Sequence, residues 1–598
     1  MSRPQTTHAR RESPVPVMNL ARMEEADAFA QTVKEFRQGK YPEDMFRRYR
    51  LQHGAYGTRM TSDYAMIRIK MPAGQVHPSQ LERIADLSEQ FSINSAHIST
   101  RESIQLHWVV LEDVSEVLRG LAEVGLTSRE ACGNAIRNVM CSPTAGVCPA
   151  EVFDATPYAQ ATARFFIRNP LNQNLPRKFK FTYSCCEQHG MARIADIGLI
   201  PQTRTVDGRT QRGFRVFVGG GLGNKSYVAH QLEDFTPEEN ILYTSIAVVR
   251  LFDRLGNRKN LARNRLRYLV NQMGWDKFRN LVLKERDVVR ATQSVVVKMP
   301  VEPPIPEITR RVHISHRTGE TPAGYARWLK SNTFAQKQDG YHTVFVGLEA
   351  GDITSTQLRA LSEIIQEYSS EGTGRIGFNQ NIAMRYIHED DLIPLYSRLL
   401  EAGLAKSGAL TMATPIGCSG TTSCNLALTN SHRLAKEIQR EFLSRDLDND
   451  DALRTSSIKI SGCPNSCGQH GIATIGFYGG GGRMGHDMYP SYMLSLGGRA
   501  DAEAVLGQNI LRVPAKRVIP VILRIIEIFR ERAQPRDDLK SWIHRVVMNG
   551  DDTTIPEIRN MLSPLTTPPT MDEDPDFYAD FGSDSSYHTK TGRGECAA

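Results

Sequence analysis

Alternating apolar and polar positions predict a β-α-β-α unit near the start of the chain. The two-residue period at 64–71 is that of a strand, with Arg68 on its polar face. Apolar side chains at 78–91 fall on one stripe, as they do in an amphipathic helix. A second strand at 98–110 and a second helix at 114–124 complete the unit.

The strand predicted at 98–110 has one apolar face and one polar face. Its polar side chains are Ser99, Arg101, Ser103, Gln105 and His107. A similar polar row follows in the segment 375–385, with Arg375, Asn379, Asn381 and Arg385. Inward-facing donors from two such strands would suit a ligand that carries many carboxylates.

The second polar row belongs to a repeat of the whole unit. Ala73-Gly74 recurs as Ala350-Gly351 at an offset of 277 residues, and the motif that begins at Cys186 recurs at Cys467 at an offset of 281. Chance matches would scatter, whereas these offsets are nearly constant. The sequence therefore predicts a duplicated chain with two pseudo-symmetric halves, with a period far longer than that of solenoid repeats.

Four of the ten cysteines form a pattern in the second half. Cys418 and Cys424 are spaced C-x5-C, and Cys463 and Cys467 are spaced C-x3-C within the sequence GCPNSCG. Disulfides are disfavoured by so few cysteines, and structural zinc usually uses closer pairs. Flanking glycines let the backbone approach a bulky inorganic group. Four convergent thiolates then favour a 4Fe–4S cluster.

The first half keeps Cys141 and Cys186 near the equivalent places but lacks the full set. It carries instead Lys178 and Lys180, which a two-residue period places on one face of a strand. These lysines could simply lie on a solvated strand face. Anion binding is the alternative that fits a half without the full set of cluster cysteines. The Gly-rich turn at 218–223 lacks a nucleotide-binding pattern, so a nucleotide site is not expected.

Composition sets the broad class. The chain has 598 residues, 40% hydrophobic and 23% charged, with no apolar run long enough to span a membrane. The N-terminus lacks the apolar core of a secretory signal, and the sparse cysteines fit a reducing compartment, so we expect a cytoplasmic protein. The formal net charge of +7 suits an acidic partner or ligand.

Four further segments have their own character. A polar arm with a helix at about 24–36 opens the chain, and a long basic helix is expected at 238–273. The Pro-rich segment at 300–306 predicts an extended linker. The Pro-rich, acidic end of the chain predicts a disordered or loosely docked tail.

These motifs together resemble the sirohaem and 4Fe–4S sulfite/nitrite reductase family, over about residue 56 to residue 500. The resemblance implies an α+β class: a pseudo-twofold, duplicated sulfite/nitrite reductase fold with ferredoxin-like half-domains and two α/β cofactor-binding domains. The expected divisions are an N-terminal arm and helix at 1–55, a first ferredoxin-like half at 56–130, a first sirohaem and substrate domain at 131–340, a second ferredoxin-like half at 341–405, an iron–sulfur and sirohaem domain at 406–562, and a polar acidic tail at 563–598.

The resemblance also implies roles for individual residues. Cys418, Cys424, Cys463 and Cys467 would hold the cluster, and the Cys467 thiolate would bridge it to the sirohaem iron. Sirohaem contacts would come from Arg101, Gln105, His107 and Asn381. The catalytic cations around the substrate would be Arg68, Arg137, Lys178 and Lys180. Some ferredoxin-dependent members carry a Tyr–Cys thioether, for which Tyr56 and Cys132 are candidates. At Cys185-Cys186 the chain departs from the pattern of the family.

The implied reaction is the six-electron reduction of sulfite to sulfide, with nitrite to ammonia as the alternative. Plant-type nitrite reductases tend to carry Asn at the second lysine position, whereas this chain has Lys180. Electrons would come from an acidic ferredoxin or from a separate flavoprotein, and no nucleic acid or membrane partner is expected. The rival classes are a non-catalytic iron–sulfur electron carrier and a zinc-stabilised binding protein.

Overall fold

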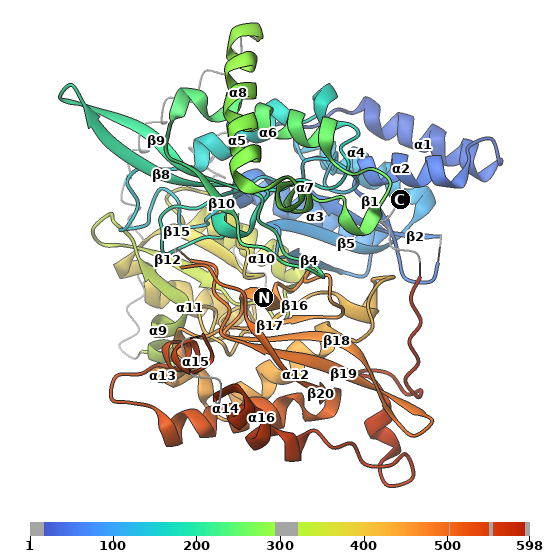
Figure 1. Cartoon of the computed structure of the whole chain (residues 1–598), viewed down its shortest axis with the longest axis vertical. Coiled ribbons are helices and arrows are strands. Elements are labelled where there is room, and N and C mark those ends of the chain that lie inside the picture. Colours follow the sequence, from blue (N-terminus) through green and yellow to red (C-terminus); the bar gives the residue numbers. More distant parts are fainter. Residues whose placement is uncertain are drawn as a thin grey trace, which may run out of the picture.

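The computed structural model describes residues 17–592 except 62, 294–320, 502, 549 and 551–553. Its described residues form four five-stranded sheets, which helices cover (Figure 1). The predicted Pro-rich linker at 300–306 lies outside the described residues. No helix of the described part is both long and apolar enough to cross a membrane.

Two of the sheets carry the predicted duplicated unit. The first has the order β1-β2-β5-β4-β13 and the second the order β11-β12-β15-β14-β3. The first contains β1 (Ala55–Gly57), β2 (Tyr64–Ile69), β5 (Ser103–Val110), β4 (Ser95–Ser99) and β13 (Asp352–Thr354). The second contains β11 (Thr333–Ala335), β12 (Tyr341–Val346), β15 (Ile382–His388), β14 (Gly374–Ile376) and β3 (Gln75–Val76).

The two ferredoxin-like halves exchange an edge strand. β13 belongs to the second half by sequence but pairs with β4, where Asp352 lies opposite His97. β3 belongs to the first half but pairs with β14, where Val76 lies opposite Gly374. The helices that follow these strands, α3 (Pro78–Phe91) and α10 (Ser355–Tyr368), lie in one hydrophobic core shared by both halves. The halves therefore form one interlocked body.

The other two sheets carry the cofactor-domain copies. The first contains β6 (Met140–Cys141), β7 (Phe181–Tyr183), β8 (Ile197–Val206), β9 (Arg209–Val218) and β10 (His230–Pro237). The second contains β16 (Ile416–Gly417), β17 (Ile458–Ser461), β18 (Ile475–Met484), β19 (Asp487–Leu496) and β20 (Gln508–Pro514). In each copy the first three strands are parallel and the last two are antiparallel. The loops after the two leading strands therefore meet at one edge of each sheet.

Helices complete the layers around each sheet. The ferredoxin-like body carries α1 (Glu24–Arg37), α2 (Glu43–Gln52), α4 (Val114–Glu123), α9 (Tyr325–Asn332) and α11 (Leu392–Glu401). The first cofactor domain carries α5 (Thr156–Phe166), α6 (Ile241–Leu255), α7 (Leu266–Met273) and α8 (Trp275–Thr292). The second carries α12 (Ser431–Ser444), α13 (Asp451–Arg454), α14 (Val518–Arg532), α15 (Leu539–Met548) and α16 (Thr554–Leu562).

Two predicted elements are wrong. The strand expected at 98–110 is the hairpin β4–β5, because Glu102 adopts a left-handed backbone with φ of 50°. The basic helix expected at 238–273 is two helices, because α6 ends at Leu255, before the extended Gly256, and α7 begins at Leu266. A Cβ on Gly256 would lie 2.5 Å from the Phe252 carbonyl oxygen, so a larger residue does not fit at this helix end.

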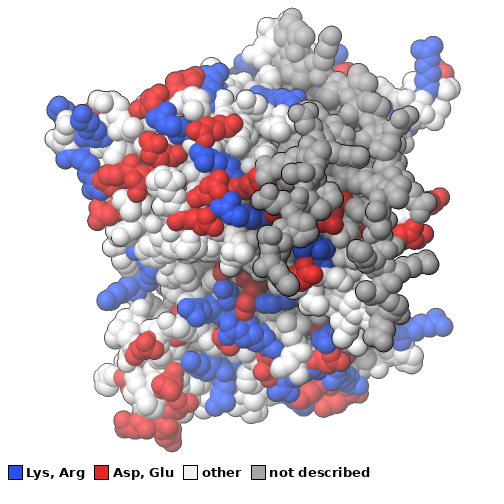
Figure 2. Space-filling model, turned by 180° about the vertical axis from the view of Figure 1, so that it is seen from behind, with Lys and Arg blue, Asp and Glu red and all other residues white. Residues whose placement is uncertain are grey.

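The C-terminal segment is also more ordered than the sequence predicts. Phe577 and Tyr578 are buried against Tyr489, and the Tyr578 hydroxyl donates to the Pro569 carbonyl at 2.7 Å. The second ferredoxin-like half begins earlier than the predicted residue 341, because α9 and β11 belong to it. On the face of the molecule in Figure 2, basic and acidic side chains are interspersed.

Candidate functional site

The four predicted cluster cysteines lie in loops at one edge of the second cofactor-domain sheet. Cys418 directly follows β16, and Cys463 and Cys467 follow β17. Because these strands are parallel, their carboxyl ends lie side by side. Cys424 follows a short 3-10 helix at Gly420–Thr422. The fold thus brings the two cysteine pairs to one place.

The two cysteine loops contact each other through their backbones. Cys418 N donates to the Ile460 carbonyl at 3.2 Å, and Gly462 N donates to Cys418 Sγ at 3.2 Å. A Cβ on Gly462 would lie 3.0 Å from Gly420 Cα, so this approach needs glycine. A sulfur that accepts a backbone N–H is stabilised as a thiolate ligand.

Burial and mutual charge act on the same thiols. Desolvation, with the Cys467 charge second, raises the pKa of Cys424 to about 12 and also raises those of Cys418 and Cys463. Each of these thiols therefore lies within electrostatic range of Cys467. Three thiols in a desolvated region and the exposed Cys467 offer four soft donors, which fit an iron–sulfur cluster whose positive iron favours the thiolate form.

The β4–β5 turn of the first half contacts the Cys467 loop. Thr100 Oγ1 donates to the Cys467 carbonyl at 2.9 Å, and Gln469 Nε2 donates to the Thr100 carbonyl at 3.2 Å. Lys459 Nζ in turn donates to Gln469 Oε1 at 2.9 Å. The next residue of the turn is Arg101, so the cluster loop and the predicted cationic face lie next to each other.

Arg101 is held by its neighbour in the first cofactor domain. Its Nη2 donates to the Asn138 carbonyl at 2.7 Å, and Asn138 Nδ2 donates back to the Arg101 carbonyl at 3.1 Å. Arg101 Nε is buried and has no hydrogen-bond partner among the described residues. A buried donor without a partner fits the carboxylate-rich cofactor that the resemblance implies.

Lys178 and Lys180 lie just before β7, beside Arg101. Burial lowers the pKa of Lys180 well below its ordinary value, and the charges of Arg101, Arg265 and Lys178 lower it further. Arg137 lies on the neighbouring segment, since its N–H donates to the Phe179 carbonyl at 2.9 Å. The four side chains whose charges act on one another here form one cationic region. We call it the cationic cluster, and its members are Arg101, Lys178, Lys180 and Arg265.

Arg265 was missed by the sequence reasoning. Its Nη2 forms an ion pair with the buried Asp196 Oδ2 at 2.7 Å. The same oxygen accepts a hydrogen bond from the backbone N–H of Lys180 at 2.9 Å. The Gly-rich turn packs on it, because a Cβ on Gly221 would lie 3.2 Å from Arg265 Nη2. The signal was the run Arg263-Asn-Arg-Leu-Arg267, which lies within the long basic helix predicted at 238–273.

Arg68 and Arg137 meet at Tyr56 on β1. The Arg68 guanidinium lies over the Tyr56 ring, 4.9 Å from its centroid, and Arg137 Nη1 donates to the Tyr56 hydroxyl at 3.2 Å. Cys132 Sγ donates to the Gly54 carbonyl at 3.4 Å, close to Tyr56 in sequence. A Tyr56–Cys132 thioether stays a prediction, which peptide mapping tests.

Gln105 joins Arg68 to His107 on the polar face of the first sheet. With the amide oxygen turned toward Arg68, Gln105 accepts from Nη2 at 3.0 Å and Nε at 3.1 Å, and its nitrogen donates to His107 Nε2 at 3.1 Å. Desolvation, with the His97 charge second, lowers the pKa of His107 to about 3. His107 is therefore a neutral group here.

The second polar row is largely paired within the protein. Arg375 and Arg385 both bind the buried carboxylate of Glu371, Arg375 Nη2 at 2.7 Å and Arg385 Nε at 2.8 Å. These arginines thus have a structural partner, which the inward-facing row did not predict. Asn381 differs, because its Oδ1 is buried and has no hydrogen-bond partner among the described residues.

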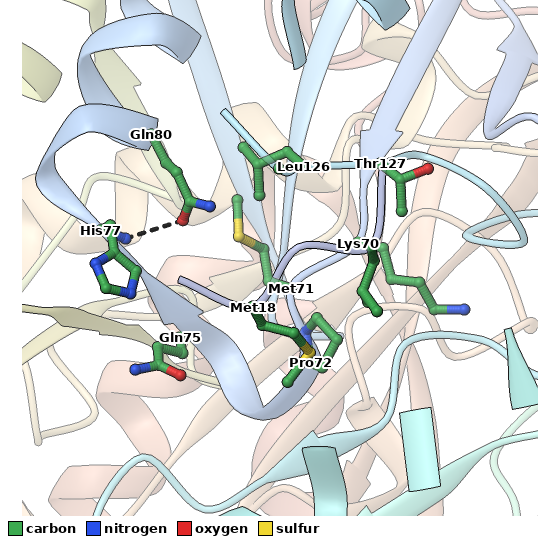
Figure 3. A pocket seen from close by; sticks show the side chains of 11 residues that line it. Met18, Lys70, Met71, Pro72, Gln75, His77, Gln80, Leu126 and Thr127 are labelled. Carbon is green, nitrogen blue, oxygen red and sulfur yellow. Dashed lines mark hydrogen bonds between the residues drawn. The ribbon is translucent and has the colours of Figure 1, made fainter. Parts of the chain in front are cut away.

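Figure 3 shows a pocket elsewhere in the ferredoxin-like body. It is lined by Lys70, Met71, His77 and Gln80 among others, and His77 N donates to Gln80 Oε1 at 3.0 Å. Lys70 Nζ also lies 3.8 Å from the buried Glu130 Oε2. None of the residues predicted for the site lines this pocket. The pocket is therefore separate from the cationic cluster.

Comparison with known proteins defines the class. The nitrite and sulphite reductase 4Fe–4S domain matches residues 132–289 and 409–550, and the nitrite/sulfite reductase ferredoxin-like half domain matches 57–124 and 334–402. The chain therefore belongs to the nitrite and sulfite reductase family. The cofactors of this family, sirohaem and a 4Fe–4S cluster, are those of this chain.

Individual relatives carry both substrate names. An assimilatory ferredoxin-dependent nitrite reductase of Haloferax mediterranei is 28% identical over 545 residues, which cover 87% of this chain and 88% of the relative. A sulfite reductase (ferredoxin) of Mycobacterium tuberculosis is 28% identical over 494 residues, covering 81% and 83%. The solved structure of the Mycobacterium tuberculosis NirA protein shares the fold, with a TM-score of 0.71, 24% identity and coverage of 89% and 96%.

Proposed function

We propose that this chain reduces sulfite to sulfide. The observation that carries this proposal is Lys180, which lies in the cationic cluster with Lys178, Arg101 and Arg265. Sulfite carries two negative charges when fully ionised and nitrite carries one. Burial and the neighbouring cations lower the pKa of Lys180, and a bound dianion stabilises its protonated form more than a monoanion does, so this additional lysine favours sulfite.

The proposed roles follow from charge and position. When bound, sirohaem would supply the iron at which the anion is reduced, and the 4Fe–4S cluster would pass on the electrons from the donor. Lys178 and Lys180 offset the negative charge of the bound anion and hold protons near its oxygens. Arg68 and Arg137 orient the same anion, each fixed by its contact with Tyr56. Arg101, Gln105, His107 and Asn381 would contact the sirohaem.

Cys467 has a distinct proposed role at the junction of the two halves. Its carbonyl is held by Thr100 from the β4–β5 turn, and its side chain is the exposed one of the four predicted cluster cysteines. An exposed sulfur next to the loop of Arg101 would suit a cysteine that holds the 4Fe–4S cluster beside the sirohaem. Cys418, Cys424 and Cys463 would complete the cluster.

The second candidate substrate is nitrite. The Haloferax mediterranei relative that is named a nitrite reductase is 28% identical over 545 residues, as similar as the relative named a sulfite reductase. Nitrite is also a small anion that the same cations would bind. We propose a ferredoxin as electron donor, because the relatives of both names carry that word and the chain has a net charge of +7.

The substitution Lys180→Asn tests the proposal. With one reductant, the wild type should form sulfide from sulfite faster than ammonia from nitrite, and Lys180→Asn should shift this ratio at least tenfold toward nitrite. Lys277→Asn is the matched control, because it removes an exposed positive charge on α8. An unchanged ratio in Lys180→Asn would refute the assigned role of Lys180.

A further inference from the structure

Four metal-binding side chains of the first cofactor domain converge outside the site described above. The ligand atoms of Cys148, Cys185, Cys186 and His189 all lie within 4.8 Å of one another. The three cysteines are buried and His189 is half-buried. We call this set the first-half tetrad.

The distances within the tetrad match one tetrahedral ion. Cys186 Sγ lies 3.9 Å from both Cys148 Sγ and Cys185 Sγ, and His189 Nδ1 lies 3.4 Å from Cys148 Sγ and from Cys186 Sγ. Sulfurs bound at about 2.3 Å to a tetrahedral Zn²⁺ lie about 3.8 Å apart. A disulfide needs about 2.05 Å between its sulfurs, far less than either spacing.

The strand register relates the tetrad to the cluster site of the second half. Cys141 ends β6 and Gly417 ends β16. Cys148 follows Cys141 by seven residues, and Cys424 follows Gly417 by the same number. Cys148 therefore occupies the position of a cluster cysteine in the duplicated fold.

The next strand of each sheet, β7 in the first half and β17 in the second, relates a second cysteine of the tetrad to the cluster site. Tyr183 pairs with the last residue of β6, and Ile460 pairs with the last residue of β16. Cys186 follows Tyr183 by three residues, and Cys463 follows Ile460 by three. Two of the four cluster positions, those of Cys424 and Cys463, therefore hold cysteine in both halves. This register corrects the sequence alignment, which matched Cys186 with Cys467 and placed Cys141 near a cluster position, whereas Cys141 lies at the place of Gly417.

The other two ligands differ between the halves. Ser142 takes the place of Cys418, and Cys185 N donates to Ser142 Oγ at 3.2 Å as Gly462 N donates to Cys418 Sγ at 3.2 Å. This correspondence places Cys185 where the second half has Gly462. The first half therefore lacks a sulfur at the place of Cys418 and has an additional one, Cys185, in the loop after β7. This change places the donor atoms of the tetrad closer together than the four cysteine ligands of a 4Fe–4S cluster would be.

We propose that Cys148, Cys185, Cys186 and His189 bind one Zn²⁺ ion. Three thiolates and one imidazole form a closed four-ligand set, which is typical of structural zinc. On binding, each cysteine thiol releases its proton to solvent and the sulfur becomes a zinc ligand.

The ion would fix the contact between the two halves. The His189 ring lies against Phe334 of β11, with centroids 5.7 Å apart. On the same side, Lys337 N donates to the Val147 carbonyl at 2.9 Å, next to Cys148. Thr144 Oγ1 lies 3.5 Å from Cys185 Sγ, as an outer hydrogen-bond partner would. Zinc would therefore hold the 142–148 loop against the second ferredoxin-like half.

Metal analysis of the full-length, iron-loaded protein tests the proposal. After expression with added zinc chloride, the protein is digested in acid and its metals are measured by inductively coupled plasma mass spectrometry. We expect one zinc per chain. Zinc-edge X-ray absorption should show three sulfurs at about 2.3 Å and one nitrogen at about 2.0 Å. Cys185→Ala should lose the zinc and keep the iron, because Cys185 is outside the predicted cluster set.

Cys141→Ala is the matched control, since Cys141 is buried in the same domain but is outside the tetrad. It should keep both metals. If Cys185→Ala does not fold, His189→Gln at the half-buried ligand gives the same test. Iron-loaded wild type without zinc, a disulfide within the tetrad, or full zinc retention in both ligand variants would overturn the proposal. None of these results depends on which anion the enzyme reduces.

Discussion

Arg68 illustrates how one side chain is held by several weak contacts. It lies over the Tyr56 ring and directs two N–H groups to Gln105, at 3.0 Å and 3.1 Å. Only a planar guanidinium can stack and donate in this forked way, so lysine cannot replace both contacts. The charge alone is therefore not sufficient at this position.

We predict that Arg68→Lys lowers kcat/KM for the anion at least tenfold, equivalent to about 1.4 kcal/mol. Arg83→Lys is the matched control, because Arg83 forms an exposed ion pair with Glu123 and should change activity little. Steady-state kinetics of both variants provides the measurement. Equal activity of the two variants would contradict the role given to Arg68.

At the scale of elements, the buried triad of Glu371 with Arg375 and Arg385 joins the start of β14 to β15. Desolvation raises the pKa of Glu371, but the two arginine charges outweigh it and lower the pKa to about 2. Because the folded pKa is below the unfolded value of about 4.3, the carboxylate contributes stability above that pH. This contribution is lost as the pH falls toward 2.

We predict that Glu371→Gln lowers the thermal midpoint at pH 7, at a cost of about 3–5 kcal/mol, because two buried cations lose their partner. Glu363→Gln at an exposed ion pair with Arg398 serves as control and should have little effect. The gap between wild type and Glu371→Gln should narrow as the pH falls from about 5 toward 2. A gap that stays constant over this range would show that the carboxylate charge is not responsible.

Which elements could be predicted depends on local signals. Helix α3 follows from its apolar stripe and ends where the pattern predicts, at Phe91, and α10 is the counterpart that the repeat implies. The β4–β5 turn was missed because Thr100-Arg-Glu102 contains no glycine or proline. Its strained Glu102 is held by a tertiary contact, in which the buried Glu102 Oε2 accepts the Cys141 N–H at 3.0 Å. Local sequence does not encode such a contact.

The C-terminal segment is another element whose role depends on tertiary contacts. Asp580 Oδ2 accepts the Asn430 N–H at 2.7 Å, Gly592 N donates to the Asn425 carbonyl at 2.9 Å, and Arg59 donates to both the Lys590 and Cys424 carbonyls. The segment therefore supports the loop that carries Cys424. Its Pro-rich, acidic composition gave no sign of this, because composition reports on solvation and not on docking.

We predict that deletion of 567–598 speeds the loss of cluster iron in air, whereas deletion of 593–598 alone does not. The physical reason is that the longer deletion removes the backbone contacts that hold the loop after Cys424. Iron per chain and the decay of the cluster absorption, followed over time, provide the measurement. Equal decay in both truncated chains would exclude support by this segment.

For the whole molecule, duplication was readable from the sequence but strand exchange was not. The constant offset predicts two similar halves, yet nothing in Gln75–Val76 or Asp352–Thr354 indicates which sheet each short strand joins. The shared core of both ferredoxin-like halves follows from that exchange. Likewise, the cysteine spacing predicts the cluster, while the place of Arg265 in the cationic cluster depends on the buried Asp196.

The net charge of +7 leads to a prediction for the electron donor. If an acidic ferredoxin docks by charge attraction, its KM should rise several-fold between low and high ionic strength, because salt screens exposed charges beyond about 8 Å at physiological strength. Turnover with a small viologen reductant serves as control and should change much less. Equal salt dependence with both reductants would contradict electrostatic docking.

The comparison of the two anions tests the central claim most directly. In one preparation with reduced ferredoxin, kcat/KM is measured for sulfite and for nitrite. Because a bound dianion stabilises protonated Lys180 more than a monoanion does, we predict that the value for sulfite is higher. A higher value for nitrite in the same iron-loaded preparation would contradict the account.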